Sequence, residues 1–332
     1  MNILITGGLG YIGSHTVIEC INSKHSVVIV DNLYNSSIKV LEKLNKFLNK
    51  DLKFYKTDMQ DIEDFEKVFI ENNIEAVIHF AGYKAVGESV ENPLKYYDNN
   101  IGITINLLRL MEKYNVKKII FSSSATVYKE SEILPLTENM PLGVTNPYGR
   151  TKLIIEEILQ DIAYVDKNFK AVILRYFNPI GAHPCGLFGE ENNGIPNNLM
   201  PYIVKVAKGE LEYLRVFGND YNTKDGTGVR DYIHVCDLAK AHIKAIKAFE
   251  FSKNINIYNI GTGTGYSVLE IINNFEKATG IKIPYKIVER RSGDIGENYS
   301  NSDKAKKELN FNTKYGILDM CHDAWNFEKG KN

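Results

Sequence analysis

Short apolar runs recur along the first half of the chain, and longer stretches with the spacing of amphipathic helices separate them. The pattern predicts strands over 2–6, 26–30, 52–57, 75–80, 118–122 and 171–176, and helices that include 11–23, 93–114 and 148–164. Strands that are apolar on both faces are typical of a parallel sheet covered by helices on both sides, with right-handed crossovers. We therefore expect an α/β fold with a Rossmann-type, doubly wound parallel sheet.

The pattern changes after about Pro179. Glycine, asparagine and proline cluster between residues 181 and 201, and the later apolar runs are shorter. We therefore expect two domains, a Rossmann domain over 1–178 and a smaller, mixed α/β C-terminal lobe over 179–332. The lobe is expected to lean over the carboxyl edge of the sheet, where parallel α/β proteins place their ligands.

Composition narrows the class of protein. The 332 residues are 44% hydrophobic and 24% charged, with a formal net charge of -1. These values are typical of a globular protein and give no reason to expect nucleic acid or an anionic membrane surface as a partner. No apolar stretch reaches the ~18 residues of a membrane-spanning helix, and the N-terminus lacks a basic leader.

The cysteines and histidines give no metal or redox pattern. Cys20, Cys185, Cys236 and Cys321 are widely separated, so we expect reduced thiols, no metal site and a cytoplasmic location. The seven histidines show no ligand spacing. His79 lies inside an apolar run, and we interpret it as a packed strand residue rather than a ligand.

The segment after the first predicted strand carries four glycines, three of them spaced as Gly7, Gly10 and Gly13, and opens the first predicted helix. It reads TGGLGYIG from Thr6. Gly7 permits a tight turn, Gly10 lets the backbone approach a pyrophosphate, and Gly13 permits close packing of helix on strand. The unpaired N–H groups of the helix N-terminus would then face the phosphates. A glycine pattern is a weak signal alone, but between a strand and a helix it predicts a dinucleotide site.

Two aspartates end the second and third predicted strands. Asp31 lies eighteen residues after Gly13, where an acid can accept hydrogen bonds from a ribose diol and repel a 2′-phosphate, so we expect NAD rather than NADP. Asp58 is placed to meet the adenine. For both aspartates the alternative is an ordinary helix N-cap.

Tyr148 and Lys152 are four residues apart and share one face of a predicted helix. An ammonium beside a phenol lowers the pKa of the phenol from about 10, and a phenolate can take an alcohol proton while hydride leaves the same carbon. Most such pairs are surface residues of a helix. Here a serine-rich strand end, 122–124, and the glycine segment precede the pair, and this context favours a catalytic pair.

With these residues assembled, the chain resembles the extended short-chain dehydrogenase/reductase family and, within it, the UDP-glucose 4-epimerases, also called UDP-galactose 4-epimerases. The resemblance runs nearly end to end. It rests on TGGLGYIGSHT at the start, HFAGYKAVGESV (79–90), YYDNN (96–100), FSSSATVY, NPYGRTK, LRYFNPIGAHP, GIPNNLMPY, VFGNDY, DGTGVRDYIHV and RRSGD.

The resemblance implies roles for individual residues. Catalysis is implied for Ser124, Tyr148 and Lys152. Cofactor contacts are implied for Gly7, Gly10, Tyr11, Ile12, Gly13, Asp31, Asn32, Asn35, Asp58, Met59, Phe80, Lys84, Asn99, Tyr148, Lys152 and Tyr176. Substrate contacts are implied for Lys84, Ser124, Phe177, Asn178, Asn198, Leu199, Phe217, Arg230, Tyr232, Arg291, Asp294 and Asn298.

The chemistry of three of these residues agrees with the implied roles. Arg230 and Arg291 offer forked donors suited to a diphosphate, and Phe217 offers a flat face suited to stacking on uracil. Without the resemblance, both arginines would be interpreted as ordinary surface ion-pair partners.

The implied activity is a reversible, NAD-dependent inversion at C4 that interconverts UDP-glucose and UDP-galactose through a 4-keto intermediate. Tyr148 takes the 4-hydroxyl proton, Lys152 lowers the pKa of Tyr148, and Ser124 bonds the 4-oxygen. The keto sugar turns about its link to the diphosphate before hydride returns, so NAD is retained. The resemblance also implies a homodimer through helices 93–114 and 148–164.

Two positions depart from the family pattern. Lys129 stands where family members commonly have glycine, so the backbone there has no extra φ freedom. Asn298 falls where the family places a residue beside the sugar's C2 substituent, and the neighbouring Tyr299 is one place too far along to fill that space. A small amide leaves room for an acetamido group, which predicts activity on UDP-N-acetylglucosamine and UDP-N-acetylgalactosamine as well. The alternative is that Asn298 is a loop residue turned to solvent.

Three other functions are weighed against this one. A nucleotide-sugar 4,6-dehydratase needs an acidic pair where this chain has Ala125 and Thr126. A net dehydrogenase would exchange NAD and release NADH. A non-catalytic NAD-binding regulator would have no need of Ser124, Tyr148 and Lys152 together.

Overall fold

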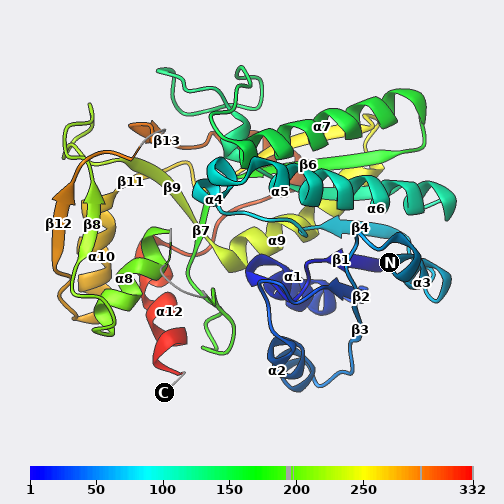
Figure 1. The fold of residues 1–332 in the computed structure, drawn as a ribbon, viewed down its shortest axis with the longest axis horizontal. Coiled ribbons are helices and arrows are strands. Elements are labelled where there is room, and N and C mark those ends of the chain that lie inside the picture. The colour runs from blue at the N-terminus through cyan, green and yellow to red at the C-terminus, as the bar shows by residue number, and fades with distance from the viewer. Residues whose placement is uncertain (192–195, 197, 292–293, 331–332) are drawn as a thin grey trace.

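A seven-stranded parallel sheet forms the centre of the computed structural model, which describes residues 1–191, 196, 198–291 and 294–330 (Figure 1). Its strand order is β10-β6-β5-β4-β1-β2-β3. The strands are β1 (Asn2–Thr6), β2 (Ser26–Asp31), β3 (Lys53–Lys56), β4 (Ala76–His79), β5 (Lys118–Ser124), β6 (Lys170–Tyr176) and β10 (Ile255–Ile260). The first six are the strands predicted from the apolar runs, and the predicted doubly wound sheet is confirmed.

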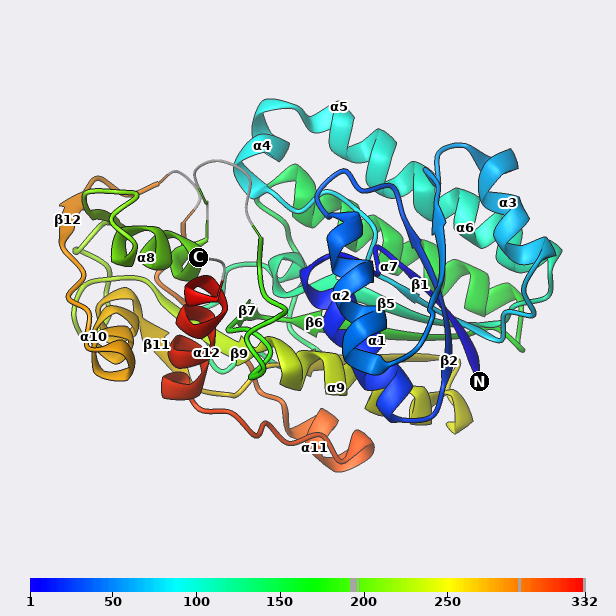
Figure 2. The same cartoon turned by 90° about the horizontal axis from the view of Figure 1, so that it is seen from below.

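Helices cover both faces of this sheet, because successive side chains of each strand point to opposite sides. Ile3 and Ile5 of β1 face one layer, whereas Leu4 faces the other. The first layer contains α1 (Tyr11–Asn22), α2 (Ile38–Leu48), α9 (Val235–Ala245), the 3₁₀ turn η3 (Ile246–Glu250) and α11 (Asp303–Leu309). The second contains α3 (Ile62–Ile70), α6 (Gly102–Lys113) and α7 (Pro147–Val165) (Figure 2).

The helix predicted over 93–114 is a composite. It consists of α5 (Pro93–Tyr96), a π-helical turn η1 (Tyr97–Ile101) and α6. A short helix α4 (Val86–Glu91) precedes it, and a 3₁₀ turn η2 (Ala125–Val127) follows β5. π-Turns within helices are frequent at functional sites, and this one carries Asn99.

A smaller lobe with its own apolar core stands beside the carboxyl ends of the strands (Figure 1). Its strands are β7 (Asn178–Ile180), β8 (Leu214–Phe217), β9 (Val229–His234), β11 (Gly265–Ser267), β12 (Tyr285–Val288) and β13 (Glu297–Asn298). Its helices are α8 (Leu199–Ala207), α10 (Val268–Thr279) and α12 (Ile317–Lys329). Strand β9 pairs with β7, β11 and β13, whereas β8 pairs with β12.

Chain beyond residue 178 also contributes to the first sheet. Strand β10 pairs in parallel with β6, from Ile255 opposite Ala171 to Ile260 opposite Tyr176. Helix α9 packs on α1. The boundary between domains 1–178 and 179–332 stays a prediction, and the sheet takes one strand and one covering helix from the second of these ranges.

His79 is packed within the sheet, as predicted. It is 1% exposed, and its ring nitrogens lie 2.7 Å from Thr6 Oγ1 and 3.0 Å from Thr104 Oγ1. Burial lowers the pKa of His79 to about 3. Among the described residues, no helix is both long enough and apolar enough to cross a membrane.

A buried ion pair joins α7 to β6. Glu156 and Arg175 have side chains 0% and 2% exposed, and the closest approach is 2.6 Å, from Arg175 Nη2 to Glu156 Oε2. The Arg175 Nε also donates to both carboxylate oxygens, at 3.1 and 3.2 Å. Ser123 of β5 donates to the same carboxylate, and Arg175 Nη1 donates to the Tyr128 hydroxyl. The Glu156–Arg175 ion pair and its hydrogen bonds therefore connect β5, β6, α7 and the loop that contains Tyr128.

We predict that Glu156→Ala lowers the free energy of unfolding by about 3–5 kcal/mol, because it leaves the Arg175 guanidinium buried and without its counter-charge. Denaturant titration measures the loss. Glu157→Ala, on the exposed side of the same helix, serves as the control and should change stability by less than about 0.5 kcal/mol. Equal effects of the two variants would contradict this role for the pair.

Candidate active site

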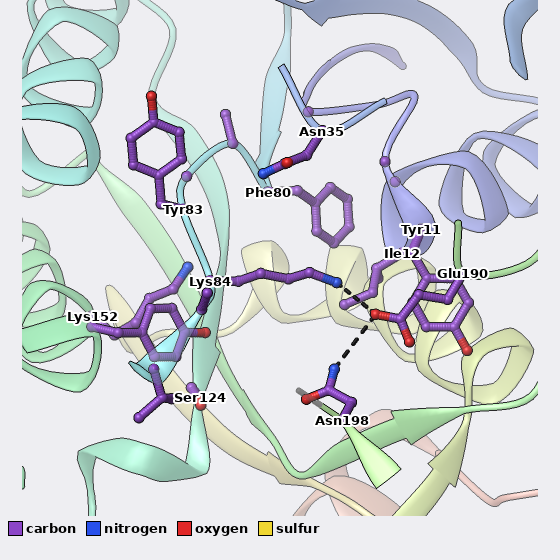
Figure 3. A pocket seen from close by; sticks show the side chains of 18 of the residues that line it. Tyr11, Ile12, Asn35, Phe80, Tyr83, Lys84, Ser124, Lys152, Glu190 and Asn198 are labelled. Atoms are coloured by element: carbon purple, nitrogen blue, oxygen red, sulfur yellow. Dashed lines mark hydrogen bonds and ion pairs between the residues drawn. The ribbon is translucent and has the colours of Figure 1, made fainter. Parts of the chain in front are cut away.

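A cavity of 1210 Å³ opens along the carboxyl ends of the sheet strands. Residues at or after the ends of β1, β2, β3, β4, β5 and β6 line it on one side, and residues of the lobe, including Asn198 and Arg230, line it on the other. Figure 3 shows Lys84 and Ser124 from the first side and Asn198 from the second. Ligands of open α/β sheets bind in this position, outside the carboxyl ends of the strands.

The glycine segment lines the cavity, and two of its positions, Gly7 and Gly13, have no room for a side chain. Gly7 has a φ of 67°, and a Cβ there would lie 2.9 Å from the backbone nitrogen of Ala81. A Cβ on Gly13 would lie 2.2 Å from the carbonyl oxygen of Gly7. Helix α1 therefore begins directly against β1, and its N-cap, Gly10, has no side chain to bond the first N–H groups. Those groups are suited to a phosphate.

Asp31 and Asp58 also line the cavity, and neither caps a helix. Ser37 caps α2 and Asp61 caps α3, so the N-cap alternatives for both aspartates are wrong. The Asp31 carboxylate accepts hydrogen bonds from Leu9 N at 3.0 Å. It also accepts from Leu33 N and Ser36 Oγ, at 2.9 and 2.7 Å. These bonds hold the acid at the end of β2.

The start of α7 places Tyr148 in the cavity. Asn146 caps the helix by accepting from Gly149 N at 2.8 Å, and Pro147 supplies a preset φ at the first helical position. A Cβ on Gly149 would lie 3.0 Å from the carbonyl oxygen of Thr126, so α7 lies close to the turn that follows β5. Ser124, at the end of β5, accepts from Thr126 N and Oγ1 at 3.2 and 3.0 Å.

Lys152 lies one turn after Tyr148 and is 5% exposed. Its Nζ donates to the Ser122 carbonyl oxygen at 2.9 Å and lies 5.9 Å from the centre of the Tyr148 ring. Burial lowers the pKa of Lys152 to about 8, although the charge of Glu156 opposes the shift.

The pKa of Tyr148 differs from the sequence-based expectation. Burial raises it well above the usual value, and the nearby Tyr176 raises it further. A hydrogen bond with Ser124 acts in the opposite direction but does not outweigh burial. The expected lowering by Lys152 is therefore wrong for the chain by itself, because desolvation of the phenolate is the larger effect.

The cavity brings together nearly all of the residues that the sequence indicated. Its wall includes every residue expected to contact the cofactor. Of the expected substrate residues, the wall includes Lys84, Ser124, Phe177, Asn178, Asn198, Arg230, Arg291, Asp294 and Asn298. Among the described residues, it does not include Leu199, Phe217 or Tyr232, whose substrate contacts stay predictions.

Two arginines of the lobe line the cavity, and neighbouring groups hold their guanidinium groups in place. Arg291 Nε donates to Asp294 Oδ2 at 2.9 Å, and the Arg291 guanidinium lies 4.9 Å from the centre of the Phe217 ring. Arg230 Nη1 donates to the carbonyl oxygens of Val229 and Gly296 at 2.8 and 3.3 Å. Part of the sequence motif around Arg291, residues 292–293, lies outside the described residues, as do 194–195 and 197 of the GIPNNLMPY segment.

Asn298 lies on β13 opposite Arg230 and lines the cavity. Its Oδ1 is buried and has no hydrogen-bond partner among the described residues. The ring of Tyr299 lies instead beside Gly265, 3.2 Å from the position of a Cβ there. Lys129 adopts backbone outside the left-handed region, and its N–H donates to the Pro141 carbonyl oxygen at 3.0 Å.

The cavity also contains residues that the sequence reasoning missed. Tyr34 and Tyr83 line it with ring centres 4.8 Å apart, and Lys95 Nζ lies 5.3 and 4.9 Å from their centres. Glu190 lines it as well and pairs with Lys84 (Figure 3). Tyr83 lies inside the HFAGYKAVGESV segment but was given no role, and Tyr34, Lys95 and Glu190 belong to none of the recognised spacings. Only the folded chain brings these residues together.

Comparison with known proteins gives one family. The model of the NAD dependent epimerase/dehydratase family matches residues 3–261. A UDP-glucose 4-epimerase from Bacillus subtilis (strain 168) is 57% identical to this chain over 99% of the chain and 97% of the relative.

Solved structures show the same fold. A UDP-glucose 4-epimerase from Bifidobacterium longum, in complex with NAD⁺ and UDP, is 52% identical with a TM-score of 0.96, covering 99% of this chain and 98% of that one. A UDP-glucose 4-epimerase from Stenotrophomonas maltophila, with bound NAD and formylated UDP-arabinopyranose, is 44% identical with a TM-score of 0.97, covering 100% and 98%.

We predict that Asp31→Ala weakens NAD binding by at least about tenfold, the scale of one charge-assisted hydrogen bond, and narrows the preference for NAD over NADP. NAD and NADP titrations measure both effects, and thermal unfolding in parallel separates loss of cofactor from loss of fold. Glu42→Ala, exposed on α2, is the control. Unchanged cofactor preference in Asp31→Ala would contradict the assignment.

Proposed function

The chain belongs to the NAD dependent epimerase/dehydratase family, and from that premise we propose that it interconverts UDP-glucose and UDP-galactose by a reversible, NAD-dependent inversion at C4. It is an isomerase of nucleotide-sugar and galactose metabolism. The observation that carries the proposal is one cavity that gathers Ser124, Tyr148 and Lys152 beside the glycine segment and Asp31. Similarity over the full chain to UDP-glucose 4-epimerases supports it.

The residues present fit a dinucleotide. The uncapped N-terminus of α1 and the steric need for glycine at Gly7 and Gly13 suit a diphosphate, and the Asp31 carboxylate suits a ribose diol. When bound, NAD⁺ supplies a hydride acceptor and later a hydride donor beside C4, together with a positively charged ring. In this proposal residues 1–178 form the NAD-binding domain and 179–332 the UDP-sugar-binding lobe, while Lys84, Ser124, Phe177 and Asn178 contact the sugar nucleotide from the first domain.

Tyr148 is the proposed proton acceptor for the 4-hydroxyl, and Ser124 is proposed to bond the same oxygen. In the chain by itself burial keeps Tyr148 a phenol. Its ability to accept a proton therefore depends on positive charge nearby, and we propose that Lys152, whose Nζ lies 5.9 Å from the centre of the Tyr148 ring, contributes it. Glu156, one turn further on, helps Lys152 to keep its proton.

Inversion requires firm contacts to UDP and loose contacts to the hexose, because the 4-keto sugar has to present its other face. Arg230 and Arg291 are proposed to hold the diphosphate. Binding energy that is placed on the nucleotide leaves the reacting ring free to turn. The redox cycle then closes within the protein, so we propose that NAD stays bound from one turnover to the next.

The acidic pair of a dehydratase is replaced here by neutral residues in the structure too. Ala125 and Thr126 line the cavity, and the Thr126 hydroxyl is bonded to Ser124. A carboxyl group at these positions is what elimination of water would require.

A homodimer and a cytoplasmic location belong to the same proposal. The proposed dimer helices are 93–114, which comprises α5, η1 and α6, and 148–164, which lies within α7. Of these, α6 and α7 lie in one layer on the same face of the sheet. The four cysteines are free, and three of them are buried, which suits a reducing compartment. The oligomeric state can be measured by light scattering.

We further propose that N-acetylated UDP-hexosamines are substrates. Asn298 lines the cavity on β13, and its buried amide oxygen lacks a partner among the described residues. Tyr299, the nearest bulky neighbour in sequence, packs beside Gly265 instead.

We predict that Tyr148→Phe loses at least about 10²-fold in kcat, the scale of a general base, and keeps its NAD. The assay converts UDP-galactose to UDP-glucose with no NAD added. Tyr164→Phe, 79% exposed near the end of the same helix, should behave as wild type. Near-normal turnover by Tyr148→Phe would remove Tyr148 from the mechanism, and stoichiometric NADH release by the wild type would point to a net dehydrogenase.

We predict that Asn298→Tyr lowers kcat/KM for N-acetylated substrates by about tenfold or more and changes kcat/KM for the plain hexoses by less than about threefold, because the larger side chain crowds only the C2 substituent. Steady-state kinetics on both substrate pairs, in wild type and variant, make the comparison. The idea fails if the wild type ignores N-acetylated sugars or if the variant handles them equally well.

A further inference from the structure

Glu190 enters the cavity directly after two residues, Phe188 and Gly189, that are packed against the sheet layer and the lobe. Phe188 is 3% exposed and packs in the core of the sheet layer that holds α1 and α2. Gly189 lies so close to α12 that a Cβ would be 2.3 Å from the Phe327 ring. The side chain of the next residue, Glu190, therefore starts from a defined position between the sheet and the lobe.

The Glu190 carboxylate is bonded to two donors, one from each side of the cavity. Its Oε1 lies 2.8 Å from Lys84 Nζ and 3.5 Å from Asn198 Nδ2 (Figure 3). The Glu190 side chain is only 10% exposed. The first contact is a short ion pair, and the second is a long hydrogen bond.

Both donors are residues that the proposed function assigns to ligands. Lys84 is assigned to the cofactor and the substrate, and Asn198 to the substrate. Asn198 occupies the N-cap position of α8, yet among the described residues its side chain bonds no N–H of that helix. The amide is directed to Glu190 instead. A carboxylate oxygen thus occupies two donors that ligand oxygens would otherwise engage.

The charge of Glu190 also opposes the ligands directly. NAD and UDP-sugars each carry a diphosphate, and the cavity has to hold both. The Lys84 side chain is 56% exposed, so solvent and salt screen this direct repulsion. Competition for the two donors is therefore the larger effect, because a ligand has to displace the Glu190 carboxylate before it can engage them.

We propose that Glu190 competes with bound ligand for Lys84 and Asn198 and so holds down the affinity for the sugar nucleotide. This inference rests on the proposed function. In it, Glu190 lowers the affinity for UDP-sugars and so speeds their release. An enzyme with a reversible reaction and a retained cofactor gains turnover when the product leaves quickly. Lys84 passes from Glu190 to the ligand on binding and returns to Glu190 on release.

Glu190→Gln tests the proposal, because the amide keeps the shape and an accepting oxygen but loses the charge. Calorimetric titration with UDP reads affinity without turnover. We expect UDP to bind about tenfold more tightly to Glu190→Gln than to wild type, with the gain shrinking as salt screens the charge. The KM for UDP-galactose should fall in parallel. Glu191→Gln is the matched control, since Glu191 is the exposed neighbour and pairs with Lys43 at 3.7 Å.

A double-mutant cycle separates competition for Lys84 from general repulsion. In a Lys84→Met background, Glu190→Gln should tighten UDP binding by less than about threefold, because no ammonium remains to be released. The proposal is overturned if Glu190→Gln binds UDP more weakly than wild type, which would make Glu190 an orienting residue, or if it matches Glu191→Gln. If Glu190→Gln binds UDP more tightly than wild type but the wild type does not epimerise UDP-galactose, only the proposed function is refuted.

Discussion

The buried contact between Glu156 and Arg175 fixes helix α7, and the geometry of the cavity depends on that helix. Removing two charges from water costs several kcal/mol per ion, and the cost is recovered only when the partners are well aligned and their other bonding groups are satisfied. Here Arg175 bonds both oxygens of the carboxylate, and Ser123 bonds it from the neighbouring strand. One placement of α7 against β5 and β6 satisfies all of these contacts. Tyr148 and Lys152 precede Glu156 on the same helix and take their positions from it.

Helix α7 also influences the pKa values of Tyr148 and Lys152, because it determines how deeply both side chains are buried. Lys152 is buried, which lowers its pKa to about 8, and Tyr148 is buried, which raises its pKa. Burial therefore works against the charged form of both groups. A phenolate beside an ammonium is stable in such a place only when further positive charge is nearby. The pKa values of both groups are therefore set mainly by how deeply α7 is buried.

Segments of the chain that pass between the sheet and the lobe fix the position of the cavity between them. Strand β10 and helix α9 return to the sheet after the lobe has begun, and the residues around Phe188 pack against both parts. Tyr11, at the start of α1, donates to the Gly181 carbonyl oxygen at 2.7 Å. Because of these crossings, residues of the sheet and of the lobe line one cavity, and Glu190 can bond donors from both sides.

The sequence by itself determined those features that depend only on residues close together in the chain. Apolar runs gave six strands of the sheet, the glycine spacing gave the turn at Gly7, and the four-residue interval gave the shared face of Tyr148 and Lys152. Each follows from local backbone geometry, which a short window contains. Tertiary structure decided that β10 belongs to the same sheet, that burial raises the pKa of Tyr148, and that Glu190 reaches Lys84. These depend on desolvation and on contacts between residues up to about a hundred positions apart, and the fold alone sets such distances.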